Sequence, residues 1–147
     1  MADLTPADEA PLLHAAAQAR LQSHSPYSRF AVGAALLDEQ GRLHLGANIE
    51  NAAYPEGLCA EAVALAHLVM AGGRRVMAAA VVADSAQPIT PCGGCRQKLR
   101  EFAGDDVQVH LCGPDGLHRT VTHWARAVCP GLRSGRWRGA LDSCRKS

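Results

Sequence analysis

The segment TPCGGCRQKLREF, residues 90–102, places Cys92 and Cys95 three positions apart in front of a helical pattern. Two thiols at this spacing can form a redox couple, half of a metal site, or a pair of buried side chains. Gly93 and Gly94 between them carry no side chain that could tune a thiol, and they allow a tight loop that aims both sulfurs at one centre. The segment therefore favours a metal site, which needs further ligands.

Cys59 is the third ligand that we predict, because it stands, like Cys92, at the start of a predicted helix. The positive end of a helix favours a thiolate over a thiol. Three thiolates around one ion are typical of zinc, and three protein ligands leave the fourth tetrahedral position open, as in catalytic sites. We expect one Zn²⁺ per chain, held by Cys59, Cys92 and Cys95.

Glu61 follows Cys59 by two positions and is the candidate catalytic residue. Residues two apart at a helix start point in different directions, so one can hold a metal while the other reaches the water beside it. A carboxylate there can take a proton from that water and pass it to a leaving group. An isolated acid in the first turn of a helix would be explained by the helix dipole alone. The assignment of Glu61 therefore depends on its thiol neighbours.

The elements that would position these residues alternate along the chain. The patterns predict a helix with Pro6 in its first turn, strands at 30–37 and 43–48, a helix at 59–71, a buried strand at 76–84, a helix at 92–102 and a strand at 107–112. This order is typical of an α/β fold, a three-layer sandwich in which helices flank a mixed central sheet of about five strands.

Composition restricts the class of protein. The 147 residues carry a net charge of +1 and no apolar run long enough to span a membrane, so we expect neither a nucleic-acid nor a membrane partner. The acidic N-terminus is unlike a secretory signal, and we expect a cytoplasmic protein whose six cysteines are thiols or ligands.

The hydrophobic pattern decays after Thr122, which predicts a catalytic domain at 1–122 and a divergent basic tail at 123–147.

Cys-Ala-Glu followed by Pro-Cys-x-x-Cys matches the signature of zinc nucleobase deaminases. With the blocks YSRFAVGAALL, NIENAAYPEGLCAE and PCGGCRQKLREF, the sequence resembles the small, tetrameric cytidine deaminases from about Tyr27 to Phe102. The resemblance implies a homotetramer that hydrolyses cytidine and deoxycytidine to uridine and deoxyuridine, with release of ammonia, in pyrimidine salvage. It also implies that Glu61 deprotonates zinc-bound water and protonates ring N3 before hydroxide attacks C4.

The resemblance further implies the substrate contacts. Phe30 matches the aromatic residue that packs near the base, and Asn48 and Glu50 match the pair that holds a ribose hydroxyl. The backbone of Ala60 matches a group that reads the cytosine edge. A carboxylate that only accepts and an amide that also donates suit a hydroxyl.

Two departures leave alternatives open. Ala62 stands where many relatives have an arginine that offsets the charge of the thiolates, so Arg96 or another donor would have to compensate. The tail lacks the phenylalanine with which relatives end, through either ordinary divergence or a change of reading frame. A deaminase of another aminated nucleoside, such as blasticidin S, and a zinc-stabilised binding domain without turnover are therefore the alternatives.

Overall fold

The computed structural model of the chain describes residues 6–113 and 115–122. The basic tail at 123–147 lies outside these residues, so the boundary between catalytic domain and tail stays a prediction. Within the described ranges, none of the helices combines the length and the apolar character that crossing a bilayer requires.

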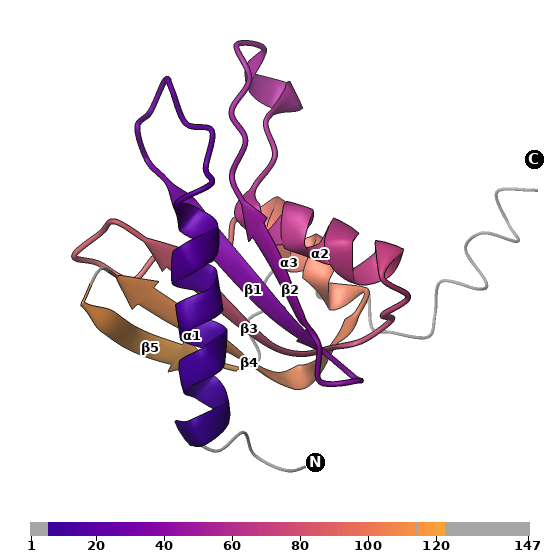
Figure 1. Cartoon of the computed structure of the whole chain (residues 1–147). Coiled ribbons are helices and arrows are strands. Elements are labelled where there is room, and N and C mark those ends of the chain that lie inside the picture. Colours follow the sequence, from indigo (N-terminus) through magenta and orange to yellow (C-terminus); the bar gives the residue numbers. More distant parts are fainter. Residues whose placement is uncertain (1–5, 114, 123–147) are drawn as a thin grey trace, which may run out of the picture.

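A five-stranded mixed sheet forms the centre of the molecule, in the order β2-β1-β3-β4-β5 (Figure 1). Its strands are β1 (Val32–Asp38), β2 (Leu43–Ala47), β3 (Val76–Ala83), β4 (Ala103–Gly113) and β5 (Gly116–Val121). Strands β3 and β4 are parallel, whereas the other neighbours are antiparallel. The predicted mixed sheet is confirmed, and β5 is a strand that the sequence analysis did not identify.

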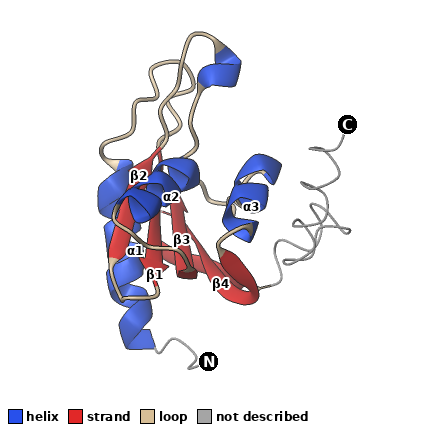
Figure 2. Cartoon of the chain, turned by 90° about the vertical axis from the view of Figure 1, so that its right-hand side faces the viewer, coloured by secondary structure: helices blue, strands red, loops and turns tan. Residues whose placement is uncertain are grey.

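Helices cover both faces of this sheet, which confirms the three-layer sandwich. Helix α1 (Pro6–Arg20) packs on one face, and α2 (Ala60–Met70) and α3 (Gly93–Arg100) lie over the other (Figures 1 and 2). Two glycines allow the close approach of helix and sheet. A Cβ at Gly33 would lie 2.1 Å from a carbonyl oxygen of α1, and one at Gly46 would lie 2.2 Å from a carbonyl oxygen of α2.

Two loops project beyond one end of the sheet, as Figures 1 and 2 show. The first, residues 21–31, connects α1 to β1, and the second, residues 48–59, connects β2 to α2 and contains the short 3₁₀ helix η1 (Tyr54–Glu56). The main-chain N–H of His24 donates to the carbonyl of Asn48 at 3.0 Å, and Glu50 N–H donates to the His24 carbonyl at 2.8 Å. The two loops are thus hydrogen-bonded to each other.

A buried carboxylate holds together the opposite end of the hairpin formed by β1 and β2. Asp38 is 1% exposed, and its Oδ2 lies 2.8 Å from both Arg42 Nε and His44 Nε2. Its Oδ1 accepts from the main-chain N–H groups of Gln40 and Arg42, each at 2.9 Å. The guanidinium of Arg42 also donates to the carbonyl of Ala71, just after α2. This network links the hairpin to the C-terminal end of α2.

Substitution of Asp38 by Asn should make the protein less stable in a pH-dependent way. Burial would raise the pKa of Asp38, but hydrogen bonds from the His44 and Arg42 side chains and from the main-chain N–H groups of Arg42 and Gln40 together hold the pKa far below its ordinary value near 3.8. A carboxyl with a lowered folded-state pKa contributes stability that is present above about pH 4 and lost as the pH falls further. We expect Asp38→Asn to lower the unfolding free energy by about 2–4 kcal/mol at pH 7. At pH 3 the loss should be smaller by about 1 kcal/mol, because the unfolded chain is then largely protonated while the folded carboxyl is still ionised.

Urea unfolding at pH 7, 5 and 3 measures this difference. Asp84→Asn is the matched control, because Asp84 pairs with Arg20 at the surface and is 59% exposed in its side chain. Such an exposed pair contributes less than about 1 kcal/mol. Equal stability losses for both variants, or a loss for Asp38→Asn that grows on acidification, would contradict the assignment.

Candidate active site

Two cysteines cap helices that begin near one another at the loop-bearing end of the sheet. Cys59 is the N-cap residue of α2, with φ −74° and ψ 152°, and Cys92 is the N-cap residue of α3. The Cys92 sulfur accepts the N–H of Cys95 at 3.4 Å. The predicted helix starts are confirmed, and both sulfurs lie at the positive ends of helices.

The three thiols form a cluster with the dimensions of a zinc site. The sulfurs of Cys59, Cys92 and Cys95 lie within 4.8 Å of one another, and the first two are 3.8 Å apart. Zn–S bonds of about 2.3 Å at tetrahedral angles separate two sulfurs by about 3.8 Å. Burial raises the pKa of Cys59 and of Cys95, and a divalent cation would offset this penalty. The donor set therefore fits Zn²⁺.

Glu61 faces this cluster from the first turn of α2. Its side chain is buried, and one carboxylate oxygen lies 3.7 Å from the sulfur of Cys95. Burial raises the pKa of Glu61, while the charge of Lys98 opposes that shift. A buried carboxylate beside the metal ligands is suited to accept a proton and to release it again.

Lys98 brings a positive charge close to the thiol cluster. A Cβ at Gly94 would lie 3.5 Å from Lys98 Nζ and 3.9 Å from the sulfur of Cys92, so the ammonium group folds back over the first turn of α3. Ala62, which follows Glu61 in α2, offers no charge. Lys98 was not among the predicted site residues, although its position three residues after Cys95 places it on the adjoining turn of the helix.

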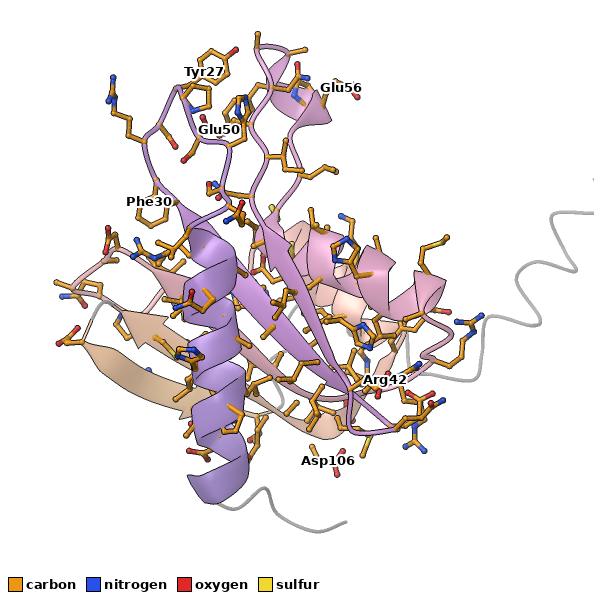
Figure 3. All side chains as sticks on the ribbon, in the orientation of Figure 1. Tyr27, Phe30, Arg42, Glu50, Glu56 and Asp106 are labelled. Carbon is orange, nitrogen blue, oxygen red and sulfur yellow. The ribbon has the colours of Figure 1, made fainter. Side chains whose placement is uncertain are left out.

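A cavity of about 830 Å³ opens above the thiols, between the two projecting loops. It is lined by all the sequence-predicted site residues except Cys95, which is buried beneath it. Figure 3 shows Tyr27, Phe30 and Glu50 on these loops. Several other lining residues were not predicted from the sequence, among them Tyr27, Ser28, Ile49, Tyr54, Leu58, Ile89 and Thr90.

The Asn48 amide is oriented by groups of the protein. Its Oδ1 accepts the Val32 N–H at 2.9 Å and is hydrogen-bonded to the Ser23 hydroxyl, and its Nδ2 donates to the Phe30 carbonyl at 2.9 Å. A main-chain donor on one side and a main-chain acceptor on the other leave only one orientation of the amide. Both acceptor positions of Oδ1 are therefore used, and one N–H of Asn48 remains to donate to a ligand.

Glu50 is an acceptor held by the first loop. Its Oε2 accepts the N–H groups of Tyr27 and Ser28 at 2.9 and 3.2 Å, and its Oε1 is hydrogen-bonded to the Ser28 hydroxyl. The Ser28 hydroxyl is the largest cause of the lowered pKa of Glu50, which keeps the carboxylate ionised. Asn48 and Glu50 together offer a donor and an acceptor to one ligand group.

Comparisons with known proteins agree with this geometry. The model of the family described as the cytidine and deoxycytidylate deaminase zinc-binding region matches residues 7–111. The cytidine deaminase of Halalkalibacterium halodurans is 46% identical over 115 residues, which are 78% of this chain and 87% of that protein. The cytidine deaminase of Mycobacterium tuberculosis is 44% identical over 94 residues, or 64% and 71% of the two chains. The crystal structure of cytidine deaminase from Burkholderia pseudomallei covers 88% of this chain and 100% of its own, with a TM-score of 0.77 at 37% identity.

Proposed function

This chain belongs to the cytidine and deoxycytidylate deaminase family, and from that membership and its site we infer that it hydrolyses cytidine and deoxycytidine. The products are uridine or deoxyuridine and ammonia, and Zn²⁺ is the cofactor. The observation that carries this proposal is the buried Glu61 carboxylate beside three thiols at zinc distances. A zinc site that only stabilised a binding domain would not require a buried carboxylate there, because burying a charge is unfavourable.

In the proposed reaction, Cys59, Cys92 and Cys95 hold the zinc ion. When bound, zinc supplies a Lewis acid that makes water nucleophilic at neutral pH. Glu61 takes a proton from the attacking water and delivers it to N3 of the ring, which makes C4 more electrophilic. The water oxygen forms a bond to C4, the bond from C4 to the exocyclic nitrogen breaks, and Glu61 carries the second water proton to the departing ammonia. Phe30 and the main chain of Ala60 line the cavity that receives the base.

The polar groups beside this centre favour a nucleoside over a nucleotide. Asn48 has an N–H to donate, and Glu50 only accepts, so the ligand group that satisfies both must accept and donate. A sugar hydroxyl does both. A phosphate ester is an acceptor with negative charge, and the Glu50 carboxylate would repel it. We therefore propose cytidine and deoxycytidine, rather than deoxycytidylate, as the substrates.

An absorbance assay with four compounds tests this substrate class. Cytidine and deoxycytidine should be deaminated. Free cytosine should react at least ~10²-fold more slowly in kcat/KM, because it leaves the polar groups of the sugar site unpaired. Deoxycytidylate should also react more slowly, because the Glu50 carboxylate repels its phosphate. Glu50→Ala should lower kcat/KM for cytidine by about 10- to 100-fold, the range for a hydrogen bond to a charged group, while the zinc content is unchanged.

Glu56→Ala is the matched control. Glu56 is a carboxylate on the same projecting loop, but it does not line the cavity (Figure 3). It should leave turnover at the parent level. Equal rates with cytosine and cytidine, or a faster reaction with an aminated nucleoside such as blasticidin S, would replace the proposed substrate by another aminated heterocycle.

The outer side of α2 supports the homotetramer that the family resemblance implies. Ala66 and Met70 are exposed there, Met70 at 85%, and Val63 is only partly buried. Apart from His67, this exposed side of α2 is apolar, and an exposed apolar surface of this kind marks a contact with another protein chain. We propose that this face joins copies of the chain in an enzyme of cytosolic pyrimidine salvage. Light scattering should give a tetramer mass that Met70→Glu lowers, and a monomeric parent at micromolar concentration would contradict the proposal.

A further inference from the structure

We propose that the Ser28 hydroxyl is a positioning group that orients the Glu50 carboxylate toward the sugar hydroxyl of the substrate. This inference rests on the proposed nucleoside deaminase function. Ser28 lies on the first projecting loop. In the part of the chain that the structure describes, it forms no hydrogen bond with the thiol cluster or with Glu61. Ser28 lines the same cavity as Glu50.

The direction of the Ser28 hydrogen bonds follows from the number of its protons. Its hydroxyl oxygen accepts the main-chain N–H of Phe30 at 3.0 Å. A hydroxyl has one proton to donate, and an ionised carboxylate can only accept. The proton of Ser28 therefore points to Oε1 of Glu50, and the Phe30 N–H helps to keep it there.

The local backbone is shaped for this arrangement. Arg29, between Ser28 and Phe30, has a φ of 57°, in the left-handed region that few residues other than glycine adopt. This turn allows the Phe30 N–H to come back to the Ser28 side chain. Ser28 thus connects the carboxylate that receives the sugar hydroxyl to the main chain of the residue that lines the base cavity.

Oε1 of Glu50 depends on Ser28 more than Oε2 does. Oε2 accepts two main-chain N–H groups, at 2.9 and 3.2 Å, whereas Oε1 has the Ser28 hydroxyl and a longer contact of 3.3 Å to the Ser28 N–H. Both loops project from the sheet, and Glu50 is only partly buried, so the rotation of its carboxylate depends mainly on its hydrogen bonds. Without the Ser28 hydroxyl, the Glu50 carboxylate would be ordered only when the substrate binds. Part of the binding free energy would then be spent on ordering this side chain.

Steady-state kinetics with matched sugars test the proposal. Ser28→Ala should lower kcat/KM for cytidine by about 5- to 30-fold, mainly through KM, because the lost bond is to a charged group at an exposed site. Ser28→Thr keeps the hydroxyl and should stay within about threefold of the parent. Ser25→Ala removes a hydroxyl from the same loop that does not contact Glu50, and it should behave like the parent.

The substrate series separates positioning from a general structural effect. Cytidine, 2′-deoxycytidine and 3′-deoxycytidine are compared in the parent, Ser28→Ala, Glu50→Ala and the double variant. For the nucleoside that lacks the hydroxyl bound by Glu50, Glu50→Ala should leave kcat/KM unchanged. Ser28→Ala should then also leave kcat/KM unchanged for that nucleoside. The double variant should lose no more than Glu50→Ala alone, because Ser28 acts through Glu50.

An equal loss with every sugar, an additive double variant, or a parent-like Ser28→Ala would overturn the role of Ser28 while leaving the deaminase function intact. A zinc-loaded parent that deaminates no nucleoside would instead overturn the proposed function, and this inference with it. Thermal unfolding and zinc content verify that each variant is folded. If Ser28→Ala does not fold, Ser28→Cys replaces it in the experiment, because a thiol is a weak donor of nearly the same volume. The same kinetic results then support or overturn the role of Ser28.

Discussion

Glu61→Gln should lower kcat for cytidine by at least ~10²-fold, the usual scale of general acid–base catalysis, while each chain keeps about one zinc ion. Glutamine preserves the shape of the side chain and its hydrogen bonding, but it cannot take up and release a proton at neutral pH. The buried carboxylate of Glu61 lies 3.7 Å from a proposed zinc ligand, Cys95, so loss of its proton transfer should affect the chemical step. The assay is the loss of cytidine absorbance, combined with metal analysis of the same sample.

Glu101→Gln is the control for this experiment. Glu101 is an exposed carboxylate at the end of α3, far along the helix from the thiol cluster. It should leave both kcat and zinc content unchanged. If Glu61→Gln deaminates cytidine at the parent rate, Glu61 is only an acid at a helix start, and the proton transfers assigned to it are wrong.

Cys95→Ser should abolish zinc binding and activity together and should also destabilise the fold. Cys95 is 1% exposed and lies beneath the cavity, where an ion shared with Cys59 would link α3 to α2. A ligand present at 10² to 10³ times its dissociation constant stabilises the folded state by about 3–4 kcal/mol, and the variant should lose that amount. Metal analysis and urea unfolding of the parent and the variant measure the two effects.

Cys112→Ala separates a zinc ligand from an ordinary buried thiol. Cys112 is also buried, but it packs against α1 on the opposite face of the sheet. Its loss should lower stability slightly and leave zinc and turnover in place. Full activity in freshly purified, reduced and zinc-free protein would contradict the metal site. A disulfide between Cys92 and Cys95 that turns over with a thiol reductant would support the redox interpretation instead.

Much of the fold could be predicted from the sequence because its strongest signals are local. The continuous apolar run of β3 predicts a strand buried on both faces, and the structure buries nearly all of it. The helix formers that follow Cys59 predict α2, and the glycine after its end, Gly72, has a φ of 88°. Strand β5 was missed because its sequence, GLHRTV, has a weak apolar alternation. It is a strand through its pairing with β4, which no local pattern encodes.

The chemistry of the candidate site could be predicted from residue types and their local positions. The motif Cys-Ala-Glu and the later Pro-Cys-x-x-Cys contain three soft ligands and an acid, and both motifs begin helices. Helix starts depend on short stretches of chain, so the placement of Cys59, Cys92 and Glu61 at such starts could be predicted. These assignments needed only residue types and predicted helix starts, whereas the substrate contacts Phe30, Asn48, Glu50 and Ala60 depended on the family resemblance.

Which of these groups meet, and in which orientation, depends on how distant segments pack in the folded chain. Cys59 and Cys92 are 33 residues apart and come within 3.8 Å because the helices that they begin pack side by side at the same end of the sheet. Ser28 and Glu50 are 22 residues apart and meet because β1 and β2 are neighbouring antiparallel strands, which brings their loops together. Sequence patterns specify a residue's local conformation and the face that it buries, whereas contacts between distant segments depend on strand order and register.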